Sequence, residues 1–213
     1  MISKRKQMTE DMKTAIRQSA AELFAEKGYL HVTMREIAKQ AGCSHTAIYL
    51  YFKNKEELLQ QIAIPSLLEL EDAFLTEMAN QAGTPFDRLV AVCNRFVAFC
   101  LRNGSLQTVL FMTGSVRVDD PAPALELNVI RNRIFAHLRQ ALQLVVGPDL
   151  ADSGSEDEEA VTNRARVLFY YVQGFVSTYT GHSEPTESLL LRVLPIFKDG
   201  IAIMTRGMTA KPV

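Results

Sequence analysis

Apolar residues recur at every third or fourth position along most of this chain, the spacing that places them on one face of an α-helix. The first stripe includes Met12, Ile16 and Phe24, and it predicts a helix that Thr9 begins and Gly28 ends. Similar stripes predict helices over residues 54–78, 85–101, 106–112, 124–146, 155–181 and 185–204. With two short helices between residues 33 and 52, we expect an all-α protein of about nine helices.

The two short helices have well-marked ends. Thr33 and Glu36 form a capping box, in which each side chain satisfies a free backbone N–H at the start of the first helix. Gly42 stands where that helix has to leave right-handed geometry. Ser44 can then cap a second helix that runs to Phe52. A helix, a glycine-containing turn and a capped helix form a helix-turn-helix.

The second short helix leaves polar side chains for a partner, while Ile48 and Ala47 face inward. Small polar residues at its start suit entry of that end into the major groove of DNA. Tyr49 and Lys53 are long enough to reach the flanking phosphates. The predicted DNA-contacting residues are Thr33, Ser44, His45, Thr46, Tyr49, Leu50, Tyr51, Lys53 and Lys55.

The motif and its flanks also resemble a known family. The residues that carry the resemblance are Leu23, Phe24, Gly28, Tyr29, Thr33, Ile37, Ala38, Ala41, Gly42, Ser44, Ala47, Ile48, Tyr49, Phe52, Lys53, Asn54, Lys55, Glu56, Glu57 and Leu58. At these spacings, residues 10–60 closely resemble the TetR/AcrR family of transcriptional regulators. His45 and Thr46 depart from the family pattern, which commonly has Lys or Arg and then Gly, so base preference there is open.

The resemblance implies a repressor that binds a pseudo-palindromic DNA operator as a homodimer and is released by a small-molecule inducer. It also implies an N-terminal domain of three helices followed by a larger helical domain for ligand binding and dimerisation. We therefore divide the chain into a flexible basic tail at 1–9, the DNA-binding domain at 10–70, and the ligand-binding and dimerisation domain at 71–213. A transcriptional activator without a small-molecule inducer is the alternative within the family.

Charge agrees with this division. The net charge is only −1, which excludes a uniformly basic nucleic-acid binder. Residues 1–60, however, hold ten Lys or Arg against seven Asp or Glu, and the remaining residues hold thirteen against seventeen. The N-terminal end is therefore the one that favours DNA.

The three cysteines indicate a reducing compartment, because their number is odd and no C-x-x-C pair is present. Cys93 and Cys100 are expected to be buried as small apolar residues. No signal peptide precedes the chain's first helix, and no apolar run is long enough to span a bilayer, so we expect a cytoplasmic protein. No cofactor and no metal site are predicted.

The larger half is rich in aromatic residues, which suits a cavity for a largely apolar ligand. Each of these side chains is individually more often a core residue. The predicted pocket residues are Phe96, Phe99, Phe111, Met112, Phe135, His137, Phe169, Tyr170 and Gln173. Further polar candidates are Asn94, Asn128, Arg131 and Tyr171.

The last two helices carry more apolar surface than one copy needs to cover, and the resemblance implies that they pair with a second copy. Two copies would place two such helix-turn-helix motifs in adjacent major grooves. The predicted interface residues are Val167, Tyr171, Phe175, Tyr179, Leu190, Leu194, Phe197 and Ile201.

Two other classes of protein are weighed against this interpretation. An enzyme is not predicted, because the sequence contains no G-x-S-x-G, no Gly-rich phosphate loop and no H-E-x-x-H. A helical interaction module that keeps the helix-turn-helix only as a scaffold would not need an exposed polar and basic set on one face. The helix over 54–78 joins the two halves, and it is either a lever between pocket and DNA or a helix that Pro65 merely bends around a core.

Overall fold

The computed structural model describes residues 4–104, 118–123, 125–147 and 154–209. Its α-helices are α1 (Lys4–Lys27), α2 (Met34–Gln40), α3 (Lys55–Ala79), α4 (Pro85–Arg102), α6 (Glu126–Val146), α7 (Gly154–Tyr179) and α8 (Thr186–Thr209). Two 3₁₀ segments, η1 (Tyr29–His31) and η2 (Ala47–Leu50), lie on either side of α2. No strand occurs among these residues, so the all-α prediction is confirmed for them.

The described residues form seven α-helices rather than about nine. One difference is that the second helix of the predicted helix-turn-helix is a 3₁₀ segment. The other is that the short helix predicted over 106–112 lies outside the described residues, as do Phe111 and Met112. None of the described helices is long and apolar enough to cross a lipid bilayer.

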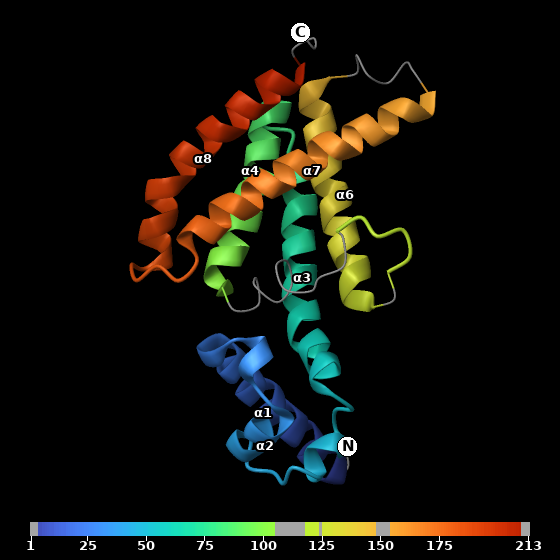
Figure 1. The fold of residues 1–213 in the computed structure, drawn as a ribbon, viewed down its shortest axis with the longest axis vertical. Coiled ribbons are helices and arrows are strands. Elements are labelled where there is room, and N and C mark those ends of the chain that lie inside the picture. The colour runs from blue at the N-terminus through green and yellow to red at the C-terminus, as the bar shows by residue number, and fades with distance from the viewer. Residues whose placement is uncertain (1–3, 105–117, 124, 148–153, 210–213) are drawn as a thin grey trace.

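Two separate hydrophobic cores divide the molecule. The first is built from α1, α2, η2 and the first turn of α3, and its fully buried members include Ile16, Ile48 and Phe52. The second begins at Ala63 and contains residues of α3, α4, α6, α7 and α8. Figure 1 shows the small domain below and the larger one above. The cores divide inside α3, after Leu59, so that a single helix belongs to both.

Helix α3 therefore connects the two domains. Asn54 caps its start by accepting a hydrogen bond from the N–H of Glu57 at 2.7 Å. The helix continues through Pro65 into the larger core, where Phe74 is buried. In Figure 1, α3 runs from the small domain up between α4 and α6. A movement of its upper part relative to the larger domain would thus be transmitted to the small domain.

The N-terminal tail is shorter than predicted. Residues 4–9 belong to α1, so the prediction of a flexible tail over 1–9 is wrong for them, and residues 1–3 lie outside the described part. Lys, Arg, Gln and Met have high helix propensity, and they extend the helix beyond the predicted cap at Thr9. Gln7 also donates to Asp11 one turn later, at 2.9 Å.

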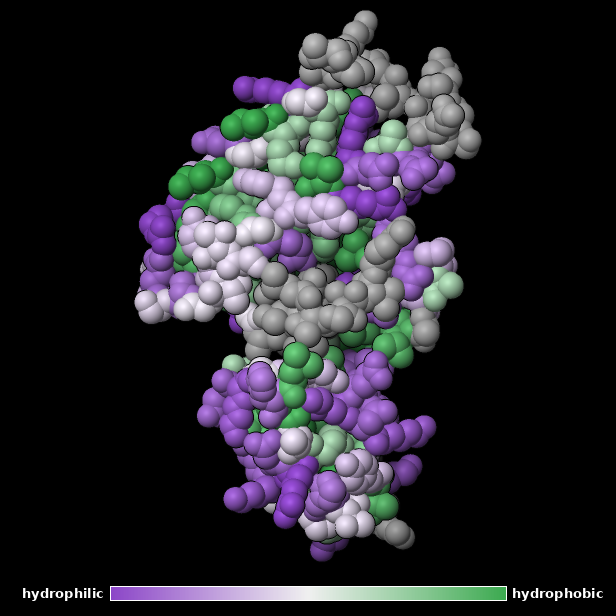
Figure 2. Space-filling view, viewed as in Figure 1, coloured by the Kyte–Doolittle hydropathy of each residue, from purple (hydrophilic) through white to green (hydrophobic). Residues whose placement is uncertain are grey.

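The surface differs between the two domains. Figure 2 shows mostly hydrophilic groups over the small domain, and separate hydrophobic groups over α8 at the edge of the larger one. The exposed apolar side chains of α7 and α8 are Val167, Tyr170, Leu191, Ile196 and Ile203. These residues are available to a partner, whereas the buried faces of both helices already pack within the chain.

Candidate functional site

The capping box at the start of α2 fixes the geometry of the motif. The N–H of Thr33 donates to Glu36 at 2.9 Å, and the N–H of Glu36 donates to the Thr33 hydroxyl oxygen at 3.3 Å. The hydrogen bonds from Thr33, together with nearby Lys27, lower the pKa of Glu36. Since the Thr33 side chain is engaged in this cap, its place in the proposed DNA-contacting set rests on its exposed position alone.

The turn after α2 is formed as the sequence predicts. Gly42 has a φ of 73°, in the left-handed region that glycine adopts without strain. The N–H of Cys43 donates to the carbonyl oxygen of Ala38 at 2.9 Å, which closes the end of the helix. The chain is thereby redirected toward Ser44 at the start of the second segment.

The second segment is a tighter structure than the predicted α-helix over 44–52. Ser44 caps it as expected, because its hydroxyl oxygen accepts from the N–H of Ala47 at 3.1 Å. Only residues 47–50 are helical, and they form the 3₁₀ segment η2. A segment of nine residues is too short to be a stable helix by itself, so the burial of Ile48 and Phe52 determines its shape. We call residues 44–53 the recognition segment.

The recognition segment presents one exposed polar face. Ser44, His45 and Thr46 are exposed, Tyr49 is 46% exposed and Leu50 is 82% exposed. The Tyr49 and His45 rings lie edge to face, with their centroids 5.4 Å apart. The members of the predicted set that are exposed along this segment are Ser44, His45, Thr46, Tyr49, Leu50 and Lys53.

Tyr51 and Lys55 do not belong to this face. Tyr51 is half-buried against the core of the small domain. Lys55 donates from Nζ to the carbonyl oxygens of Tyr29 and Val32, at 2.7 and 2.9 Å, and its Nζ lies 4.3 Å from the centre of the Tyr29 ring. Desolvation lowers the pKa of Lys55. We therefore remove Lys55 from the DNA-contacting set, because its ammonium group joins α3 to η1 inside the domain.

Replacing Lys55 is expected to affect stability, and replacing Lys53 is expected to affect DNA binding. Lys55→Met leaves two backbone carbonyl groups without their donor, which costs about 1–3 kcal/mol of unfolding free energy. Lys53→Met should change that free energy by less than about 0.5 kcal/mol, since the side chain is exposed. Chemical denaturation of the two variants measures the difference. Equal stabilities would contradict the structural role of Lys55.

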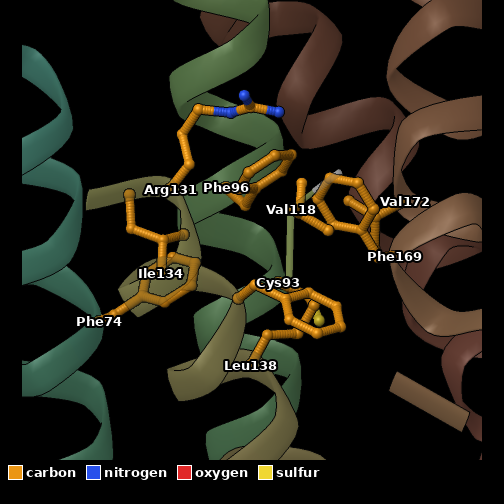
Figure 3. Close-up of a pocket in the computed structure, with 10 residues that line it drawn as sticks. Phe74, Cys93, Phe96, Val118, Arg131, Ile134, Leu138, Phe169 and Val172 are labelled. Atoms are coloured by element: carbon orange, nitrogen blue, oxygen red, sulfur yellow. The ribbon is translucent and has the colours of Figure 1, made fainter. Parts of the chain in front are cut away.

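An internal cavity lies in the larger domain, between α3, α4, α6 and α7 (Figure 3). Its lining residues are Phe74, Cys93, Phe96, Val118, Arg131, Ile134, Phe135, Leu138, Phe169 and Val172. The Phe169 ring packs edge to face against the rings of Phe96 and Phe135, and its centre lies 5.9 Å from the centre of each. The cavity measures only about 10 Å³, the space that one water molecule needs. A ligand would therefore have to move these side chains apart.

Some of the predicted pocket residues line this cavity and others do not. Phe96, Phe135 and Phe169 line it. Phe99 is buried outside its described lining, Tyr170 is 64% exposed on the surface, and His137 lies 3.5 Å from a carboxylate oxygen of Glu71, so these three residues do not line this cavity. The amide oxygen and nitrogen of Gln173 are buried with no hydrogen-bond partner among the described residues, and they do not line this cavity either.

An open polar groove adjoins the cavity. It measures about 360 Å³, and its lining residues are Asp119, Pro121, Asn132, Phe135, Ala136, Arg139, Thr162 and Arg166. Phe135 lines both spaces, so its ring forms part of the wall between the cavity and the groove. Phe135 therefore lies between the cavity and a space that is open to solvent.

The cysteines behave as apolar residues in the described structure. Cys43, Cys93 and Cys100 are all free thiols, and the last two are buried. Burial raises the pKa of Cys93 to about 12 and that of Cys100 well above its ordinary value. Neither thiol therefore carries the thiolate that redox chemistry requires at neutral pH.

The exposed apolar face of α7 and α8 differs from the predicted one. Leu190, Phe197 and Ile201 are buried in the chain's own core, so the prediction that they contact a second copy is wrong. Tyr171, Phe175, Tyr179 and Leu194 are half-buried against that core. Of the predicted set, only Val167 is exposed, at 52%. The outward face consists instead of Val167 and Tyr170 on α7, and of Leu191, Ile196 and Ile203 on α8.

The comparison with family models gives the identity of the small domain. Residues 16–62 match the model of the bacterial regulatory proteins of the tetR family, and this range covers the small core and the recognition segment. Residues 16–62 are a TetR-family domain. The resemblance inferred from the spacing of the motif residues is thereby confirmed.

The chain is also similar to curated transcriptional regulators over part of their length. The fatty acid metabolism regulator protein of Bacillus subtilis is 54% identical over 41 residues, which are 19% of this chain and 21% of that protein. The HTH-type transcriptional repressor KstR2 of Mycolicibacterium smegmatis is 25% identical over 118 residues, 54% of this chain and 55% of that protein. The matched part of the chain thus spans about a fifth of the length of the first relative and about half of the length of the second.

The TetR-family regulator PfmR from Thermus thermophilus shares the whole fold. Its crystal structure aligns with a TM-score of 0.61, at 20% sequence identity, over 90% of this chain and 97% of that one. The likeness in fold therefore covers the larger domain as well as the small one.

The sequence pattern alone does not predict a role for Phe74 or Glu71. Phe74 lies on α3 and lines the cavity. Glu71, one turn earlier, is 8% exposed and accepts two hydrogen bonds from Arg133 of α6, each at 2.6 Å. The apolar period of α3 could not reveal either role, because it does not tell which helix packs opposite. The sequence does contain one signal for Glu71, because a carboxylate inside an apolar helical stripe indicates a buried residue that needs a partner.

Proposed function

We propose that this chain is a sequence-specific DNA-binding repressor of transcription, acting as a homodimer that a small, largely apolar ligand releases from its operator. The observation that carries the proposal is the exposed face of the recognition segment, held by a capped helix, a glycine turn and two buried side chains, Ile48 and Phe52. Repression rather than activation follows the expectation for the family.

The proposed DNA contacts fall into two kinds. Ser44, His45 and Thr46, at the start of the recognition segment, are placed to reach base edges in the major groove. Tyr49 and Lys53 are placed to reach phosphates, where contacts set the position of the protein on the duplex without reading its sequence. This division gives each residue a distinct expected effect.

Gel shifts on the upstream region of the protein's own gene test this division. Tyr49→Phe and Lys53→Ala should weaken binding to every duplex to a similar extent, and Lys53→Ala should lower the slope of log affinity against log salt by about 1. Thr46→Ala should change the preference among operator variants, by about 1–3 kcal/mol at one base pair. Equal effects of all three variants on all duplexes would contradict a base-reading role for Thr46. No binding at low salt would favour an interaction module over a repressor.

Pairing of two copies is supported by the outward apolar face of α7 and α8. A single recognition segment is short and reads few base pairs, whereas two related by two-fold symmetry read two half-sites. The small domains lie at the opposite end of the molecule from the C-terminal parts of α6 and α8 in Figure 1, so contact through α7 and α8 leaves them accessible.

Control by a ligand is supported by the position of α3. This helix carries Phe74 into the cavity wall and begins directly after the recognition segment. Glu71 on the same helix binds Arg133 of α6, which carries the cavity residues Arg131, Ile134, Phe135 and Leu138. A ligand that separates α6 from α3 would therefore shift α3 and, with it, the recognition segment. For this reason we favour a role of α3 as a lever between the pocket and DNA over the alternative that Pro65 merely bends this helix around a core.

The ion pair between Glu71 and Arg133 should carry part of this coupling. In the unmodified protein, an effective ligand is expected to lower operator affinity by a factor in the typical range of about 5–150. Arg133→Met should bring that factor closer to 1, because the ion pair between α6 and α3 is then lost. Arg139→Met, which removes a pair between α6 and α7, is the matched control and should leave the factor unchanged. Fluorescence anisotropy of labelled operator, with and without ligand, measures both factors.

The coupling hypothesis fails if Arg133→Met and Arg139→Met respond to the ligand in the same way as the unmodified protein. It also fails if both lose the response equally, because that result would indicate general loosening of the larger domain.

A further inference from the structure

We propose that the ligand of the internal cavity is an acid, an apolar molecule with one anionic group that binds the guanidinium group of Arg131. This inference rests on the proposed ligand-controlled function and adds the chemical class of the ligand. It is carried by one buried charge in an otherwise apolar wall. Phe74, Phe96, Phe135 and Phe169 suit the body of such a molecule but offer nothing that recognises a charged group.

Arg131 is a buried residue of the cavity wall. Its side chain is 3% exposed, and it is the one charged residue among the described residues that line this space. Figure 3 shows its guanidinium group at one end of the cavity, beyond the Phe96 ring, and Leu138 at the other end. Both residues belong to α6. One end of the cavity therefore lies beside a cationic group, whereas the other end is apolar.

The charge at that end favours an anion. Burial lowers the pKa of Arg131 to about 10, which still leaves the side chain cationic at neutral pH. Nη1 donates to the amide oxygen of Asn128 at 2.9 Å, a neutral acceptor one turn earlier. A carboxylate can accept two parallel hydrogen bonds from a guanidinium group, and such charge-assisted bonds are stronger than bonds between neutral groups. In a site of low polarity this attraction also exceeds its value in water.

The size of the cavity restricts the apolar part of the ligand. Arg131 and Leu138 are seven residues apart, so they are separated by about 10.5 Å along α6. A medium-length acyl chain or a fused aromatic ring system spans that distance. Because the cavity holds only about 10 Å³, binding has to displace the Phe side chains, including Phe74 of α3. Entry of the apolar part is thus the event that would move α3.

Two pairs of probes separate charge from shape. Decanoate is compared with 1-decanol, and 2-naphthoate with 2-naphthalenemethanol, each below its micellar or solubility limit. Binding to the full-length protein is measured by titration calorimetry and by the rise in Tm, which follows from binding to the native state alone. In at least one pair, we expect the acid to bind about tenfold or more tightly than the alcohol, the preference given by a hydrogen bond to a charged group.

Variants of Arg131 assign the preference to this residue. Arg131→Met should abolish the preference for the acid while the alcohol still binds, and Arg131→Lys should keep part of the preference because it keeps the charge. Arg139→Met, in the adjoining groove, should keep the full preference. The comparison of acid with alcohol on the unmodified protein and on Arg131→Lys tests the proposal even if Arg131→Met fails to fold.

Each outcome has a defined meaning. Equal binding of acid and alcohol to the unmodified protein overturns the assignment of an acidic ligand and leaves a ligand-controlled repressor intact. A preference that survives in Arg131→Met, or equal loss of both probes in that variant, overturns the role of Arg131. Binding of none of the four probes overturns the acidic ligand together with the cavity as a ligand site, whereas DNA binding in the gel shift would remain.

Discussion

Replacing Ile196 and Ile203 of α8 by glutamate is expected to convert a homodimer into a monomer. The two side chains are 62% and 70% exposed, and they lie seven residues apart on one face of the helix. In a dimer that buries this face, two carboxylates per copy would enter an apolar interface, and burying unpaired charges is costly. Light scattering at micromolar concentration should therefore give half the mass of the unmodified protein.

Loss of the dimer should also reduce operator affinity strongly. When two recognition segments are linked, binding of the second is intramolecular, which raises the overall affinity by about 10²–10⁴. The double variant should lose a factor of this size on an operator with two half-sites and much less on a single half-site. This is the largest effect on DNA binding that we expect from residues far from DNA.

Leu75 of α3 and Leu144 of α6 provide the matched control. They are 48% and 49% exposed, and they lie on helices outside the proposed interface. Their replacement by glutamate should leave the mass and the operator affinity unchanged. If the control pair also yields a monomer, or if the α8 pair stays dimeric, the proposed interface is wrong.

The second large effect concerns Phe52, whose replacement by alanine should unfold the small domain selectively. Phe52 is fully buried and ends the recognition segment, and deletion of a buried Phe side chain costs about 3–5 kcal/mol. The core of the small domain contains few residues, so it cannot redistribute this loss. Operator binding should fall sharply, while the larger domain keeps its structure.

Phe197 is the matched residue of the other core, since it is also fully buried. Hydrogen exchange followed by mass spectrometry distinguishes the two variants. Phe52→Ala should speed exchange in residues 16–59, and Phe197→Ala should speed it mainly in residues 89–201. Uniformly faster exchange along the whole chain in both variants would contradict two separate cores.

The parts of the fold that depend on short-range signals could be predicted from the sequence. The cap at Thr33 and Glu36 and the turn at Gly42 involve residues no more than five positions apart, and each occurs as predicted. The extent of the recognition segment was overestimated, because its shape depends on burial of Ile48 and Phe52 against α1 and α3 rather than on helix propensity.

The functional surfaces of the larger domain could be predicted only in outline. A helical stripe does not reveal whether it faces a core, a cavity or a second copy, since that depends on helices distant in sequence. The apolar pattern predicts Phe197 and Ile201 in the dimer interface, but they face the chain's own core. Tyr170 is predicted in the pocket, yet it is exposed. Arg131 is one of several polar candidates in the sequence, and only its burial beside four Phe rings distinguishes it.

Footprinting of the full-length protein on DNA recovered by genome-wide binding tests the central claim most directly. The account predicts two equal protected patches, with their centres one helical turn or a multiple of about 34–36 Å apart on one face of the duplex. Both patches should disappear together in the Tyr49→Phe, Lys53→Ala double variant. The account, in which a homodimeric repressor binds DNA through residues 44–53, would be contradicted by any of three results. These are a single protected patch, protection that the double variant leaves unchanged, or no protection at low salt.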